Sequence, residues 1–157
     1  MTQQINEELF KKSIFVLLKE TFDKGDGIYL DQGTSLEETL ALLSAAEASR
    51  PIRESGTSIA SHVYHLLFYV RILNDYMDGK WHEKVDWPGS WARKIVSENE
   101  WDALRKQLKN DYDALLKHLE SFTDWNDERR LGGALGILAH SAYHLGAIRQ
   151  ILRVIKK

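Results

Sequence analysis

The sequence predicts an all-α protein, an up-and-down four-helix bundle with one additional short helix. Apolar residues recur at intervals of three and four along most of the 157 residues. Only Pro51 and Pro88 interrupt the chain as prolines, which favours long helices over strands and turns. Short polar links join the long amphipathic segments, which predicts that neighbouring helices are antiparallel. We expect residues 1–157 to form a single domain.

Two helices and a polar connection are expected in the first third of the chain. The first helix spans about 4–22 and is ended by two closely spaced glycines. A capping box of Ser35 and Glu38 begins the second, which stops before Pro51 because the residue preceding a proline avoids the α region. A polar connection follows, over 49–56.

The middle of the chain is expected to form one long helix and a long aromatic connection. The helix spans about 57–79 and carries a regular apolar stripe. The connection spans 80–96 and contains three tryptophans, Trp81, Trp87 and Trp91. These tryptophans could cover a site, contact a second chain or close one end of the bundle. No segment predicts a strand, and 27–30 is too short to decide.

Two further helices complete the predicted bundle. Ser97 and Glu100 form a capping box, and apolar residues then keep the helical spacing to about Phe122. A polar link covers 124–130, and the last helix is expected over about 133–155. The apolar stripe of this last helix contains two histidines.

Composition narrows the possible functions. Lys and Arg total 21 against 23 Asp and Glu, so the net charge of -2 gives no basic field for nucleic acid. No segment has the length and apolarity of a membrane span or a signal peptide, and we expect a cytoplasmic protein. The absence of cysteine excludes disulfides, thiolate ligands and cysteine nucleophiles.

His140 and His144 are the most specific chemical feature of the sequence. Four residues apart on a helix, they lie on one face, where two imidazoles can bind the same ion. Ser141 follows His140, so the glutamate of a zinc-peptidase H-E-x-x-H motif is missing. The alternative is a pair of core histidines hydrogen-bonded to backbone or hydroxyl groups.

A third ligand would come from the helix over 57–79, which contains His62 and His65. Both lie within its wide apolar arc, and the stripe alone places His62 nearer its centre. Three histidines from two helices would leave a position open for water or substrate, as catalytic metal sites do. His82 and His118 lie in a loop and among polar residues, and we expect ordinary surface histidines there.

Two segments of the sequence resemble the DinB/YfiT-like superfamily. They are S-I-A-S-H-V-Y-H-L-L over 58–67 and H-S-A-Y-H-L-G-A-I-R-Q over 140–150. The pattern of that superfamily has a histidine seven residues after a Ser/Thr-hydrophobic start, and an H-x-x-x-H near the C-terminus. The resemblance implies a DinB-like bundle in which His65, His140 and His144 bind a divalent ion, usually nickel or zinc. His62 is then an alternative ligand or a supporting partner.

The resemblance also implies a function. Some similar proteins are transferases that use a low-molecular-weight thiol, and others are described as hydrolases. We therefore expect a metal-dependent enzyme that acts on a small molecule. We expect it to bind neither nucleic acid nor a membrane, and a homodimer is one assembly that it could form. The alternative is a non-catalytic bundle, a small-ligand binder or a dimeric scaffold, whose histidines are hydrogen-bonded core residues. The sequence identifies no catalytic residue, although Tyr64, Tyr69 and Tyr143 could line the cavity.

Overall fold

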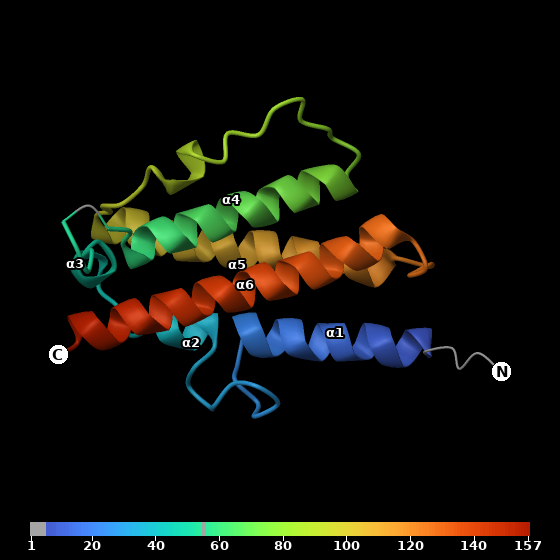
Figure 1. The fold of residues 1–157 in the computed structure, drawn as a ribbon, viewed down its shortest axis with the longest axis horizontal. Coiled ribbons are helices and arrows are strands. Elements are labelled where there is room, and N and C mark those ends of the chain that lie inside the picture. The colour runs from blue at the N-terminus through green and yellow to red at the C-terminus, as the bar shows by residue number, and fades with distance from the viewer. Residues whose placement is uncertain (1–5, 55) are drawn as a thin grey trace.

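Four long helices form the body of the protein in the computed structural model, which describes residues 6–54 and 56–157. They are α1 (Glu7–Phe22), α4 (Ile59–Met77), α5 (Glu98–Ser121) and α6 (Glu128–Ile155). Two short α-helices, α2 (Leu36–Leu40) and α3 (Ala45–Ala48), and a 3₁₀ turn, η1 (Gly89–Trp91), lie between them. Figure 1 shows the long helices packed side by side. The described residues contain no strand, so the predicted all-α four-helix bundle is confirmed.

The long connection between α4 and α5 determines the direction of α5. It runs back along the bundle, so α5 starts at the same end as α4 (Figure 1). Arg71 on α4 pairs with Asp111 on α5 at 2.6 Å, and Asp78, the C-cap residue of α4, pairs with His118 farther along α5 at 3.1 Å. These pairings show that α4 and α5 are parallel, so the prediction of antiparallel neighbours is wrong for this pair because the connection between them is long. Figure 1 shows α6 returning antiparallel to both.

The predicted second helix is two short helices in the structure. Ser35 caps α2 and Ser44 caps α3, and each belongs to its own capping box, with Glu38 and Glu47 respectively. The carbonyl oxygen of Leu43 accepts a hydrogen bond from the indole of Trp101 on α5 at 3.0 Å. Because the backbone here is held by a side-chain cap and a tertiary hydrogen bond, one continuous helix does not form.

The N-termini of α1 and α6 need comparison with the predicted boundaries. Helix α1 begins at Glu7 with Asn6 as its N-cap, and the predicted start at residue 4 lies outside the described residues. Helix α6 begins at Glu128 rather than near residue 133. The carboxylate of Asp127 accepts the N–H of Arg130 at 2.9 Å, a capping bond that starts the helix ahead of its apolar stripe.

A continuous apolar core joins the helices and supports α4 against α6. Its largest fully buried side chains include Trp101 and Tyr112 of α5, and the ring of Tyr112 stacks on that of Phe22 in α1, with 4.0 Å between the ring centroids. Within the described residues no helix has the length and apolarity needed to cross a membrane. Buried histidines of α4 and α6 belong to the candidate site, among them His65 and His144.

Candidate metal centre

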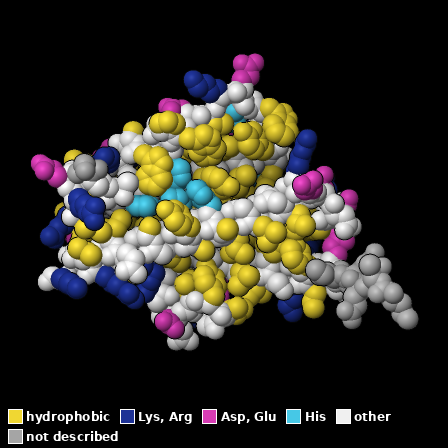
Figure 2. All heavy atoms as spheres, viewed as in Figure 1, with side chains coloured by type: hydrophobic (Ala, Val, Ile, Leu, Met, Phe, Trp, Pro, Cys, Tyr) yellow, Lys and Arg dark blue, Asp and Glu magenta, His cyan; other side chains and the backbone are white. Residues whose placement is uncertain are grey.

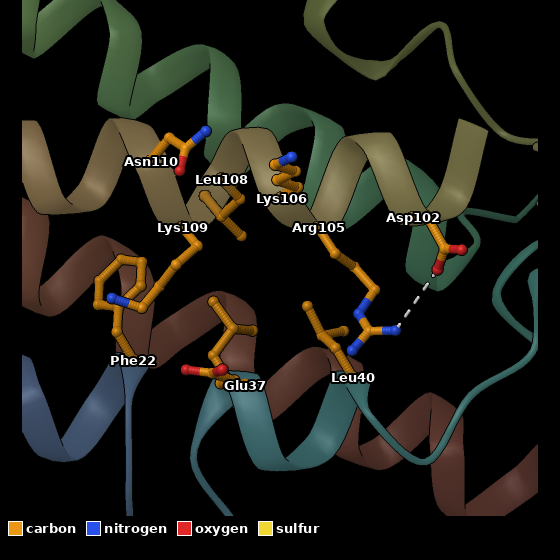
Figure 3. Close-up of a pocket in the computed structure, with 10 residues that line it drawn as sticks. Phe22, Glu37, Leu40, Asp102, Arg105, Lys106, Leu108, Lys109 and Asn110 are labelled. Atoms are coloured by element: carbon orange, nitrogen blue, oxygen red, sulfur yellow. Dashed lines mark ion pairs between the residues drawn. The ribbon is translucent and has the colours of Figure 1, made fainter. Parts of the chain in front are cut away.

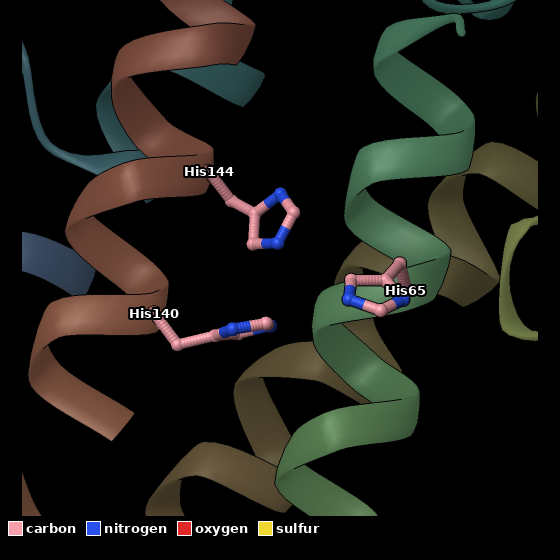
Figure 4. A group of neighbouring side chains, drawn as sticks. All are labelled: His65, His140 and His144. Atoms are coloured by element: carbon pink, nitrogen blue, oxygen red, sulfur yellow. The ribbon is translucent and has the colours of Figure 1, made fainter. Parts of the chain in front are cut away.

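Helices α4 and α6 bring His65, His140 and His144 together. One ring nitrogen of each histidine lies within 4.8 Å of a ring nitrogen of the other two. His140 and His144 lie one turn apart on α6, and His65 faces them from α4 (Figure 4). Because α4 and α6 are antiparallel, a side chain midway along each meets the other across the interface. The three histidines that the resemblance implied are therefore neighbours in the structure, at a separation that suits one small cation.

A serine in the connection fixes the hydrogen position on His65. The hydroxyl of Ser90 donates to the carbonyl oxygen of Trp87 at 2.5 Å and lies 2.6 Å from Nδ1 of His65. A hydroxyl has one hydrogen, which is used on the carbonyl, so His65 must donate from Nδ1. Nε2 of neutral His65 is then an unprotonated nitrogen, and Figure 4 shows the ring with one nitrogen towards α6.

Nε2 of His140 is a buried nitrogen without a hydrogen-bond partner among the described residues. Its ring is held by stacking on Tyr69, with centroids 3.9 Å apart and planes inclined by 16°. A buried polar atom left without a partner costs free energy. His140 is one of the three histidines of the group, and a shared ion is a partner that its ring could take, so the residues present fit a divalent metal.

His62 lies behind His144 and outside the three-nitrogen group. Its Nδ1 is 3.0 Å from Nδ1 of His144, and its Nε2 is 3.1 Å from Oγ1 of Thr57. The apolar stripe alone had placed His62 nearer the centre of the helix face than His65. The structure assigns His65 to the group and makes His62 a partner of His144.

The histidines are neutral near pH 7. Burial lowers the pKa of His62 to about 4, with the neighbouring His65 adding to the effect. Burial and the other histidines lower the pKa of His140 to about 4 and that of His144 to about 3. Burial also lowers the pKa of His65. Only unprotonated imidazole binds a metal, so the site is in its binding form at neutral pH.

Aromatic side chains of the connection cover the histidines. The ring of Trp91 stacks on His65, with centroids 4.1 Å apart and planes inclined by 16°, and meets His62 edge-on. Trp87 lies against Phe68 and Tyr69 of α4. Figure 2 shows the imidazoles at the surface among hydrophobic side chains, so the site opens on this face. The sequence left three roles open for the tryptophans of this connection. Two of them, Trp87 and Trp91, cover the site.

The third tryptophan of the connection and the three tyrosines suggested to line the cavity lie at different distances from the histidines. Trp81 stacks on Tyr76 near the C-terminal end of α4 and is 70% exposed. Tyr143 is 71% exposed, with its ring edge-on to His144. Tyr64 is partly buried beneath the guanidinium of Arg93. Of the three tyrosines suggested by the sequence, Tyr69 and Tyr143 therefore contact the histidines.

The other two histidines form polar contacts near the C-terminal end of α4. Nε2 of His82 lies 2.9 Å from the carboxylate of Asp75. His118, from α5, contacts Asn74 through Nδ1 and Asp78 through Nε2, each at 3.1 Å. His82 is an ordinary surface histidine, as predicted, whereas His118 is partly buried and links α5 to α4.

A second concave surface lies away from the histidines, between α2 and α5. It has a volume of about 340 Å³ and an apolar floor that includes Phe22, Leu40 and Leu108. Charged side chains form its rim, among them Arg105 and Asp102, which pair at 3.8 Å (Figure 3). None of the three clustered histidines lines this groove, so it is separate from the candidate metal centre.

The fold and the site define a class of protein. It is a helical bundle whose candidate metal centre is formed by histidines of two antiparallel helices. Residues 30–148 match the family model of the DinB superfamily, and the chain belongs to this superfamily. The match includes all three histidines as well as His62 and Ser90. Comparisons with curated proteins and with solved structures gave no match.

Replacing Ser90 with alanine is expected to weaken metal binding by about 10–100-fold, the usual effect of removing an outer partner of a ligand. The variant would lose the oxygen that accepts the Nδ1 hydrogen of His65. Competition with a chromophoric chelator measures the affinity. Ser13, an exposed residue of α1 whose hydroxyl donates to the carbonyl oxygen of Leu9, offers the matched control Ser13→Ala. Equal affinities for the two variants would contradict the role of Ser90.

Proposed function

We propose that this protein binds one divalent metal ion through His65, His140 and His144 and uses it in an enzymatic reaction on a small molecule. The observation that carries the proposal is the convergence of three neutral imidazoles, one with a buried nitrogen that has no other partner. Nickel and zinc are our candidate ions, since imidazole suits both.

The donor set supports catalytic rather than purely structural use of a metal. Structural zinc sites are usually closed by four protein ligands, whereas three leave a position open for water or substrate. Imidazoles carry no charge, so a bound ion would keep its full 2+ charge and lower the pKa of a coordinated water or thiol. We propose hydrolysis or thiol transfer as the reaction class. Because the chain lacks cysteine, a thiol would have to come from a low-molecular-weight cosubstrate.

The aromatic side chains around the site have a binding role in this proposal. Trp91 and Tyr69 hold the rings of His65 and His140 by stacking, which fixes their orientation. Trp87 and Tyr143 are more exposed, at 40% and 71%, and offer apolar surface beside the opening. A substrate with an apolar or planar part and an anionic donor group fits these walls and the positive charge of the ion.

A non-catalytic bundle is the second candidate. The hydrogen bonds of His65 with Ser90 and of His62 with Thr57 favour it, since they satisfy some of the buried ring nitrogens. The unpartnered nitrogen of His140 opposes it. The two candidates differ in metal content and in turnover.

Metal analysis of tag-free protein tests the proposal. We expect about one nickel or zinc ion per chain, in keeping with the one group of three ligands found among residues 6–54 and 56–157. Turnover of small esters, amides or thiol acceptors should appear with metal and disappear after chelation. A folded protein that takes up neither ion would contradict the proposed function. Stoichiometric metal without turnover in any of these assays would support the metal site but contradict the enzymatic part of the proposal.

A further inference from the structure

His62 and His144 form a buried pair of imidazoles between α4 and α6. Their Nδ1 atoms are 3.0 Å apart, and the side chains are 6% and 1% exposed respectively. At this distance two neutral imidazoles share one hydrogen bond, so one Nδ1 carries the hydrogen and the other accepts it. The position of the hydrogen on one ring therefore determines its position on the other.

Two arrangements of hydrogens satisfy this chain of contacts. In the first, His144 donates from Nδ1 to His62, and His62 donates from Nε2 to Oγ1 of Thr57. Nε2 of His144 is then free to bind a metal. In the second, His62 donates from Nδ1, the hydroxyl of Thr57 donates to His62, and Nε2 of His144 carries a hydrogen. The second arrangement prevents metal binding by that nitrogen.

The contrast with His65 shows why His144 needs such a partner. The hydrogen-bond chain of His65 ends, through Ser90, at the carbonyl of Trp87, which can only accept. The tautomer of His65 is therefore fixed in advance. The chain of His144 ends at the hydroxyl of Thr57, which both donates and accepts, and Thr57 is exposed to solvent.

We infer that His62 is a positioning residue that holds His144 in its metal-binding tautomer, with Thr57 as the outer acceptor. The inference rests on the proposed function and adds to it a fourth histidine that is not a ligand. Outer partners of metal-bound histidines orient the ring and raise its basicity. An imidazole in this place, instead of a carboxylate, keeps the site free of negative charge.

A matched pair of substitutions separates the hydrogen bond from packing. His62→Leu removes the acceptor, whereas His62→Asn has nearly the same shape as leucine and places an amide oxygen near the position of Nδ1. We expect His62→Leu to weaken Zn²⁺ binding by about 10–100-fold and His62→Asn to recover most of that loss. His118→Leu, which removes a partly buried histidine away from the site, should bind as the wild type does.

Nitrogen-15 NMR of the histidine side chains gives a readout that a purely structural role would not move. In the zinc-loaded wild type we expect a hydrogen on Nδ1 of His144 and on Nε2 of His62. In the metal-free protein both arrangements should contribute. Thermal unfolding of every variant without metal shows whether the fold is retained.

Three results would overturn the inference. They are equal zinc affinity of wild type and His62→Leu, equal weakening by leucine and asparagine, and a hydrogen on Nδ1 of His62 in the zinc-loaded protein. A wild type that binds no zinc or nickel would instead overturn the proposed function, and this inference with it. If His62→Leu does not fold, the NMR measurement on the wild type still decides.

Discussion

Replacing His144 with alanine is expected to reduce the bound metal from about one ion per chain to background. His144 lies one turn from His140 on α6, faces His65, and is nearly fully buried. Without it, two imidazoles remain, too few to hold an ion against water in the usual tetrahedral site. The loss should exceed the roughly 10–100-fold effect of removing an outer partner such as Ser90. Elemental analysis of tag-free protein, followed by zinc titration, measures it.

A control must separate loss of the ligand from loss of the fold. His118→Ala removes a partly buried histidine at a distance from the group and should keep its metal. His140→Ala removes a second candidate ligand from a less buried position and should lose metal as His144→Ala does. Circular dichroism without metal establishes that each variant is helical. Stoichiometric metal in folded His144→Ala would show that the ion binds elsewhere.

The long helices could be predicted because each has a regular apolar stripe that becomes a buried face. In α5, the spacing that runs through Trp101, Leu108 and Leu115 corresponds to side chains that are almost fully buried. The capping box at Ser97 begins this helix in the structure as predicted. Periodicity and capping are local, and for α4 and α5 they agree with the tertiary packing.

The structure differs from the prediction where nonlocal contacts, or a weak local signal, determine where a helix begins and which way it runs. The prediction of one helix over residues 36 to 50 was wrong. Ser44 caps a new helix, and the carbonyl oxygen of Leu43 accepts a hydrogen bond from distant Trp101. The early start of α6 depends on one cap at Asp127, whereas apolar periodicity begins later. The parallel direction of α5 follows from the path of the long connection, which carries no periodic signal.

The candidate site was predicted in part. The spacing of His140 and His144 indicated that they share a face, and the resemblance favoured His65, which the structure brings beside them. Periodicity favoured His62 over His65, and it misled because both side chains are buried, so the centre of the apolar stripe does not identify the residue that faces α6. Ser90 was missed because it lies in the connection, and no sequence pattern links a loop hydroxyl to a particular helical histidine.

Lowering the pH from 7 to 5 is expected to destabilise the metal-free protein by a few kcal/mol. Burial holds the pKa of His62 and His140 at about 4 and that of His144 at about 3, against an ordinary value of 6.5 in the unfolded chain. Between these values the unfolded chain binds more protons than the folded one, so stability falls as the pH falls. Each of these histidines lowers the free energy of unfolding by about 1–2 kcal/mol between pH 7 and pH 5.

Urea unfolding at pH 7 and pH 5, in the presence of a chelator, measures this loss. Carboxylates with a lowered pKa, such as Glu47 at about 2, stay largely ionised over the interval in both states and contribute little. His140→Gln keeps a polar side chain that does not titrate, so its stability should depend less on pH, by the share of one histidine. Equal stability of the wild type at both pH values would show that these imidazoles take up protons in the fold as readily as in the unfolded chain, so that burial does not lower their pKa. Metal binding would then weaken between pH 7 and pH 5, because protons and a metal ion compete for the same nitrogen lone pairs.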